Sequence, residues 1–192
     1  TVTPIRNLDL AIAVYDGAGK LLAVGDNDGL GTGETIPNVA PTTGIMYVAV
    51  LESKEVQGLT PTENVTDEYQ LTVQMTTFGL HEEREPNETD QDATQVEPAL
   101  PVTGYLGRLR DLDRFRFAGP GGEYSIEVAG TSLPPLRIRI DDGPASEKAR
   151  QTAKLKPGSI VALERADPEP PDARPIAPRV EIPYTLVVRP AR

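Results

Sequence analysis

Residues 111–117 read Asp-Leu-Asp-Arg-Phe-Arg-Phe, so that Phe115 and Phe117 alternate with Arg114 and Arg116. This is the period-2 pattern of a β-strand with one buried face. We therefore expect a strand at this position, with both phenylalanines in a hydrophobic core.

The rest of the chain carries the same kind of signal in short runs. Its 19 prolines and 17 glycines fall between β-branched runs, which is typical of an all-β protein. Residues 8–15 form an apolar strand candidate, and a turn at 16–19 leads into a second run at 20–24, so we predict a β-hairpin. Further strands are predicted at 44–51 and 69–73.

The order of these runs recurs farther along the chain. Gly158 lies 114 residues after Gly44, and Tyr184 lies 115 residues after Tyr69. A divergent internal repeat is the simplest explanation of this agreement. The recurring runs are residues 136–140, 158–164 and 184–188.

The repeat predicts two antiparallel, jelly-roll-like β-sandwich domains in tandem, at 1–80 and 81–192. The second copy has a front at 101–106, 111–117 and 124–128 that the first copy lacks. We therefore expect the first domain to lack its N-terminal strands. Truncation or cleavage of the chain is the favoured reason, and strands borrowed from elsewhere are the alternative.

The apolar positions of these strands predict the cores of the two domains. We also expect a short helical turn at 148–156 and an extended, proline-rich surface loop at 167–178. The residues expected to be largely buried in the second domain are Phe115, Phe117, Tyr124, Ile126 and Val128. Those expected to be buried in varying degree in the first domain are Ile12, Val14, Tyr47, Val48 and Leu71.

Composition excludes several classes of function. The chain has no cysteine, so disulfides, thiolate ligands and cysteine nucleophiles are absent. A net charge of −10 argues against nucleic acid or an anionic membrane as partner, because both require a basic surface. There is neither an apolar run of about 18 residues nor a signal pattern at the N-terminus. If the protein is exported, its signal lies upstream of this sequence.

An acidic segment, residues 81–92, separates the two copies. Within it Glu83, Glu85 and Asn87 alternate, so an extended backbone would direct three oxygen-bearing side chains to one side. Calcium prefers six to eight hard oxygen ligands, and this spacing suits it. The alternative is an ordinary solvated acidic linker, which is the usual fate of a charge run.

The order of several short motifs resembles the bacterial pre-peptidase C-terminal domain family. Residues 85–88 (Glu-Pro-Asn-Glu), 102–106 (Val-Thr-Gly-Tyr-Leu) and 111–117 resemble the opening of such a domain. Residues 8–16, 44–50 and 69–73 resemble its second half. The resemblance covers most of residues 8–75 and 83–188, and its specificity comes from the order of the motifs.

The resemblance implies a small jelly-roll-like β-sandwich appended to exported proteins, with a role in binding rather than chemistry. Some members of the family, including the collagen-binding modules of clostridial collagenases, bind calcium through an acidic segment before the first strand. The matching positions in this chain are Glu83, Glu85, Asn87 and Glu88, with Asp111 and Asp113 as downstream candidates.

We therefore expect a non-catalytic accessory binding module of a secreted, periplasmic or cell-surface bacterial protein, within a larger polypeptide. Its target would be a protein or polysaccharide surface, without nucleic-acid binding or membrane insertion. The alternative is a structural spacer that holds another domain away from the cell. An enzyme is not expected: a Ser-His-Asp triad would have to use His81, the only histidine, which lies in the linker. The chain also has no tryptophan to line a carbohydrate cleft.

Overall fold

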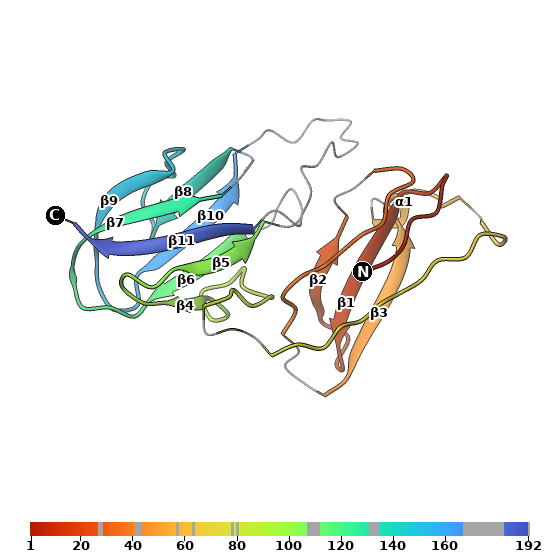
Figure 1. Ribbon diagram of the computed structural model, residues 1–192, viewed down its shortest axis with the longest axis horizontal. Helices are drawn as coiled ribbons and strands as arrows, with labels where there is room; N and C mark the ends of the chain where they lie inside the picture. Colours follow the sequence, from red (N-terminus) through yellow and green to blue (C-terminus); the bar gives the residue numbers. More distant parts are fainter. Residues whose placement is uncertain are drawn as a thin grey trace. The chain divides into compact units, whose positions relative to one another are not determined.

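Figure 1 shows the computed structural model, and its described residues are almost entirely β-structure and loops. This confirms the predicted all-β class. The chain folds into two compact units, one holding Thr1–Thr77 and the other the described residues from 79 onward. The predicted domain bounds, 1–80 for an incomplete first domain and 81–192 for the second, stay a prediction. No described helix is long and apolar enough to cross a membrane. The structure describes residues 1–26, 29–40, 44–56, 58–62, 64–77, 79, 81–106, 112–130, 135–166 and 183–191.

The second unit consists of two four-stranded sheets, as the predicted β-sandwich requires. Its strands are β4 (Thr94–Val96), β5 (Val102–Tyr105), β6 (Leu112–Phe117), β7 (Gly122–Ala129), β8 (Leu136–Ile140), β9 (Arg150–Leu155), β10 (Ile160–Arg165) and β11 (Pro183–Pro190). One sheet has the order β4-β6-β10-β8 and the other β5-β11-β7-β9. All neighbouring strands are antiparallel except β4 and β6, which run parallel.

The core of the second unit is built from the inner faces of both sheets. Phe115 and Phe117 of β6 are buried, and their rings meet those of Tyr184 and Tyr124 edge-on, with centroids 6.3 and 4.7 Å apart respectively. Such edge-to-face pairs stabilise a core beyond the effect of the buried area alone. All five core residues predicted for this unit are buried, namely Phe115, Phe117, Tyr124, Ile126 and Val128.

The first unit contains a three-stranded sheet of order β2-β1-β3 and the one-turn helix α1 (Ser53–Val56). Its strands are β1 (Leu10–Asp16), β2 (Leu21–Gly25) and β3 (Met46–Glu52). The predicted hairpin is confirmed: β1 pairs antiparallel with β2, and the Asp16 carboxylate accepts hydrogen bonds from the turn amides of Ala18 and Lys20. Ile12 and Val14 are buried as predicted, and Val48 packs against their cluster.

Strand pairing in the two units follows the same order. β1 pairs antiparallel with β3, as β8 pairs with β10. Val2 makes isolated antiparallel bridges to both Glu34 and Leu71. In the second unit, β7 likewise pairs with two neighbours, β9 and β11. The described part of the first unit therefore shows the pairing order of β7 to β11, with no counterpart of β4, β5 or β6 among its described residues.

The sequence-based predictions for Tyr47 and Leu71 were wrong, because both side chains are exposed. The glycine spacing equates Tyr47 with the buried Val161, but in the pairing of β1 and β3 it is Val48, opposite Val14, that faces the core. A slip of one residue turns every side chain of a strand to the other face. Leu71 lies in a segment, residues 69–73, that makes a single bridge rather than the predicted strand.

The helical turn expected at 148–156 was also wrong, because β9 occupies most of this segment. β9 pairs with β7, and Gln151, Ala153 and Leu155 are less exposed than the residues between them. This period-2 pattern, fixed by a neighbouring strand, overrides the weak local helical preference. The loop predicted at 167–178 lies outside the described residues.

Candidate metal centre

The acidic segment leads into the second unit as an extended chain bonded to β5. The amide of Glu83 donates to the carbonyl of Thr103 at 2.9 Å, and the amide of Thr103 donates to the carbonyl of His81 at 2.9 Å. Successive side chains of an extended chain point to opposite sides. Glu83, Glu85 and Asn87 are accordingly buried, while Arg84 between them and the preceding Glu82 are exposed and Pro86 is half-buried. The alternation predicted from the sequence is therefore present in the fold.

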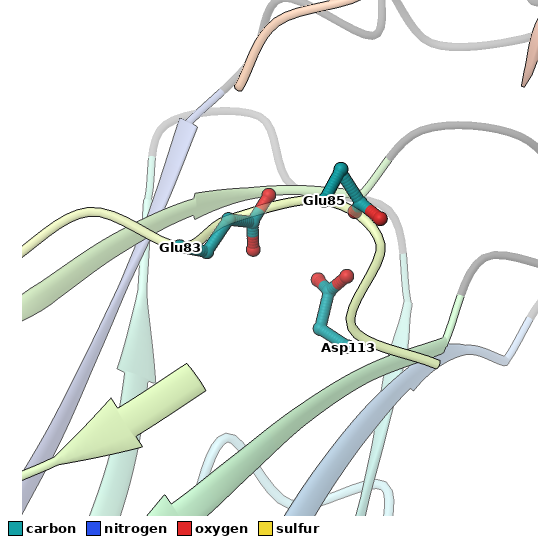
Figure 2. A group of neighbouring side chains, drawn as sticks. All are labelled: Glu83, Glu85 and Asp113. Atoms are coloured by element: carbon teal, nitrogen blue, oxygen red, sulfur yellow. The ribbon is translucent and has the colours of Figure 1, made fainter. Parts of the chain in front are cut away.

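Three buried carboxylates meet at this point. One carboxylate oxygen each of Glu83, Glu85 and Asp113 lies within 4.8 Å of the others, and Figure 2 shows the three groups converging. Asp113 comes from β6, where it shares the inward face with Phe115 and Phe117. The cluster thus joins the incoming segment to the core side of the sandwich.

Tyr184 of β11 lies beside this cluster and contacts two of its members. Its hydroxyl lies 2.8 Å from Glu83 Oε2 and 2.5 Å from Asp113 Oδ2. Burial raises the pKa of Tyr184 well above its ordinary value, and the charges of Asp113 and Glu83 raise it further, so the phenol stays protonated. A hydroxyl carries one proton and donates to one carboxylate at a time. A proton on the second carboxyl group or a cation nearby would stabilise the other contact.

Gly104 of β5 makes room for this arrangement. A Cβ atom at residue 104 would overlap Glu83 Oε2 and the ring of Tyr184. The amide of the next residue, Tyr105, donates to Glu83 Oε1 at 2.7 Å. A glycine inside a strand often marks such a close approach.

Asn87 continues the alternating series and is the most unusual polar residue of the segment. Its side chain is fully buried, and neither its amide nitrogen nor its amide oxygen has a hydrogen-bond partner in the described part of the structure. Leaving a buried carboxamide without partners costs about 1–3 kcal/mol. A bound cation that takes the amide oxygen as a ligand would remove part of this cost.

The donor set fits a hard cation. Carboxylate and amide oxygens are the ligands preferred by calcium and magnesium, whereas softer metals favour nitrogen and sulfur. Three carboxylates held this close would repel one another in a poorly solvated site if all were ionised. A divalent ion between them would convert that repulsion into attraction.

Not every residue predicted for the metal site belongs to the cluster. Glu83, Glu85 and Asp113 come together. Asn87 follows Glu85 closely in the sequence and is also buried. Glu88 is half-buried and outside the group of three; its carbonyl accepts a hydrogen bond from Arg114 Nε at 2.9 Å. Asp111 lies outside the described residues. That these residues are metal ligands stays a prediction.

Sequence reasoning missed the two residues that support the cluster. Tyr184 matches Tyr69 as a strand residue, and nothing in its local sequence indicates that its hydroxyl meets carboxylates 71 and 101 residues away. Gly104 lies within the motif at 102–106. A glycine at a position where a strand pattern expects a side chain was the available signal for a close contact.

Comparisons with known proteins give a distant structural likeness. No family model matches the chain, and no curated protein matches it. The pre-peptidase C-terminal domain of a collagenase from Bacillus anthracis is 15% identical, with a TM-score of 0.38 over 54% of this chain and 97% of that chain. The CUB1-EGF-CUB2 region of human MASP-1/3 is 11% identical, with a TM-score of 0.27 over 98% of this chain and 91% of that chain. Likenesses this distant assign no function.

Proposed function

We propose that the chain is a non-catalytic accessory binding module of a secreted or cell-surface bacterial protein, and that calcium stabilises its second unit. The observation that carries the proposal is the buried cluster of Glu83, Glu85 and Asp113, reached by an extended segment that also buries Asn87. The motif resemblance described above points in the same direction.

Calcium fits this cluster better than magnesium does. It accepts six to eight oxygens in flexible geometry, and a carboxylate can supply it with one or both oxygens. Glu83, Glu85 and Asp113 offer up to six carboxylate oxygens, some of which already accept protein hydrogen bonds. Magnesium demands a tighter octahedron and loses its water reluctantly. We therefore expect calcium selectivity.

The bound ion would act as a cross-link within the second unit. Glu83 and Glu85 belong to the incoming segment and Asp113 to β6, while Tyr184 connects the cluster to β11. An ion held by the three carboxylates would therefore fix the incoming segment to both sheets. Binding only to the folded state stabilises that state by mass action.

The burial of the cluster supports a structural rather than a catalytic role. Glu83 and Asp113 are almost completely inaccessible, whereas carboxylates that act on a substrate must face a cleft. His81 is exposed. Neither the buried carboxylates nor the exposed His81 resembles a nucleophile held next to its general base.

A purely structural spacer is the alternative to a binding module. Tyr47 and Tyr69 of the first unit are exposed, and exposed tyrosines offer large, rigid contact areas that favour binding. A spacer would need no such residues on its surface.

Isothermal titration with calcium tests the metal site directly. The wild type is expected to bind calcium, and calcium at 100 times its dissociation constant should stabilise the second unit by about 2.7 kcal/mol. The double variant Glu85→Gln, Asn87→Ala should lose both effects. Glu82→Gln makes the same chemical change at an exposed neighbour and should leave them intact.

Two further measurements complete the test. A chelator should lower the melting temperature of the wild type, and magnesium should compete poorly. If the wild type gives neither heat nor a melting shift at millimolar calcium, the metal proposal is wrong.

A further inference from the structure

Residues 69–75 of the first unit carry a strand pattern whose apolar side is exposed. Tyr69, Leu71, Val73 and Met75 alternate with polar residues, and their exposed fractions are 49%, 38%, 58% and 78%. Isolated apolar residues on a surface are common, but four in a period-2 row would share one face of an extended chain. The row is therefore a candidate interaction surface.

Among the described residues, the backbone of this segment is hydrogen-bonded along one edge. The amide of Thr72 donates to the carbonyl of Thr1 at 2.9 Å, and the amide of Thr3 donates to the carbonyl of Gln70 at 3.0 Å. Leu71 lies between these bonded residues, in a bridge with Val2. Alternate residues of a strand direct their amide and carbonyl groups to opposite edges.

Residues 69, 71 and 73 thus direct their backbone groups to the second edge. None of these groups has a backbone hydrogen bond within the part of the chain that the structure describes. An edge with unpaired amides and carbonyls is a template for another strand.

The second unit shows what fills the equivalent edge there. Leu186 of β11 stands opposite Val128 of β7 on one side, as Leu71 stands opposite Val2. On its other side Leu186 stands opposite Val102 of β5. β5 thus occupies the edge that residues 69–73 leave open.

The side chains along β5 define the chemistry of the occupant. Tyr184 stands opposite Gly104, and a Cβ atom at residue 104 would overlap the tyrosine ring. Tyr69 holds the position of Tyr184 in the repeated pattern Tyr-x-Leu-x-Val. A strand that fits beside residues 69–73 therefore needs a glycine opposite Tyr69 and an apolar residue opposite Leu71.

We propose that residues 69–73 are a strand-accepting edge, which binds an extended polypeptide segment of β5-like sequence in antiparallel orientation. Main-chain hydrogen bonds to residues 69, 71 and 73 would supply affinity, and the glycine and apolar positions would supply specificity. This site is separate from the proposed metal centre, so either proposal can fail without the other.

Amide hydrogen exchange on the full chain tests this edge at single-residue resolution. The probe is a synthetic peptide with the sequence of residues 100–106, Leu-Pro-Val-Thr-Gly-Tyr-Leu. At saturating peptide, the amides of Tyr69, Leu71 and Val73 should exchange at least about tenfold more slowly. The Thr72 amide is already bonded to Thr1 and should change little, so it is the internal control.

Two matched variants separate strand pairing from nonspecific contact. A peptide with valine in place of its glycine should bind at least about tenfold more weakly, because the added side chain meets Tyr69. In the protein, Leu71→Pro removes an amide from the open edge and leaves the bonds to Thr1 and Thr3 untouched. In this variant, the peptide should no longer slow amide exchange at residues 69 and 73. The β1 amides should exchange as slowly as they do in the wild type.

Three results would overturn the proposal. The first is unchanged exchange of residues 69, 71 and 73 at millimolar peptide. The second is equal binding of the peptide by Leu71→Pro. The third is protection that arises without peptide and grows with protein concentration, which would make a second copy of this chain the occupant.

Discussion

Strand β11 and residues 69–73 carry the same pattern in different surroundings. Tyr184, Leu186 and Val188 of β11 are fully buried, whereas Tyr69, Leu71 and Val73 are 49%, 38% and 58% exposed. β11 lies between β5 and β7 and faces the β6 sheet across the core. In the described structure, the backbone hydrogen bonds of residues 69–73 run to Thr1 and Thr3.

The contrast between β11 and residues 69–73 shows that an alternating pattern fixes which side chains share a face. Neighbouring strands then determine whether that face is covered. The tyrosine shows this most clearly. Tyr184 reaches two buried carboxylates and an edge-on phenylalanine, but the same residue type at position 69 is half exposed. A matched substitution in each segment measures what the surroundings contribute.

Shortening the central leucine should have the largest effect. Leu186→Ala leaves a cavity in a closed core and should lower the free energy of unfolding of the second unit by about 2–5 kcal/mol. Leu71→Ala removes a partly exposed side chain and should cost the first unit less than about 1 kcal/mol. Urea unfolding followed by NMR reports each unit separately. Equal losses in the two units would show that residues 69–73 are covered as β11 is.

Removing the tyrosine hydroxyl should have a smaller effect. Tyr184→Phe deletes the donor that contacts Glu83 and Asp113, and the loss of a hydrogen bond to a charged group costs about 1.5–3 kcal/mol. Tyr69→Phe should change the stability of the first unit by no more than about 0.5 kcal/mol, because its surroundings are open to water. The same unfolding measurement applies. If Tyr184→Phe leaves the free energy of unfolding of the second unit unchanged, the hydroxyl contacts make no net contribution to stability.

Adding a methyl group to β5 should have an effect of about 1–3 kcal/mol. Gly104→Ala places a Cβ atom against Glu83 and Tyr184, which must then shift. Gly122→Ala is the control, because its Cβ would meet only the Tyr124 ring at 3.4 Å. We expect the control to be neutral or slightly stabilising, and thermal unfolding of both variants checks this. If Gly104→Ala is as stable as the wild type, the close packing around Tyr184 is not required.

The carboxylate cluster of Glu83, Glu85 and Asp113 also combines a local sequence pattern with contacts between distant parts of the chain. The alternation of Glu83, Glu85 and Asn87 was visible in the sequence because neighbours along an extended chain have fixed relative directions. The meeting of this segment with Asp113 followed only from a resemblance, and Tyr184 was not anticipated at all. Contacts between residues this far apart in sequence depend on how strands are ordered in the two sheets, which no local pattern records.

Local sequence patterns were enough to predict the all-β class, the hairpin of β1 and β2 and the buried face of β6. These features rest on backbone periodicity and turn chemistry, which act over a few residues. The exposure of Tyr47, the pairing of β9 within a sheet and the convergence of three acidic side chains became visible only in the folded chain. Register and neighbouring strands set these outcomes, because burial depends on what packs against a face and not on the face alone.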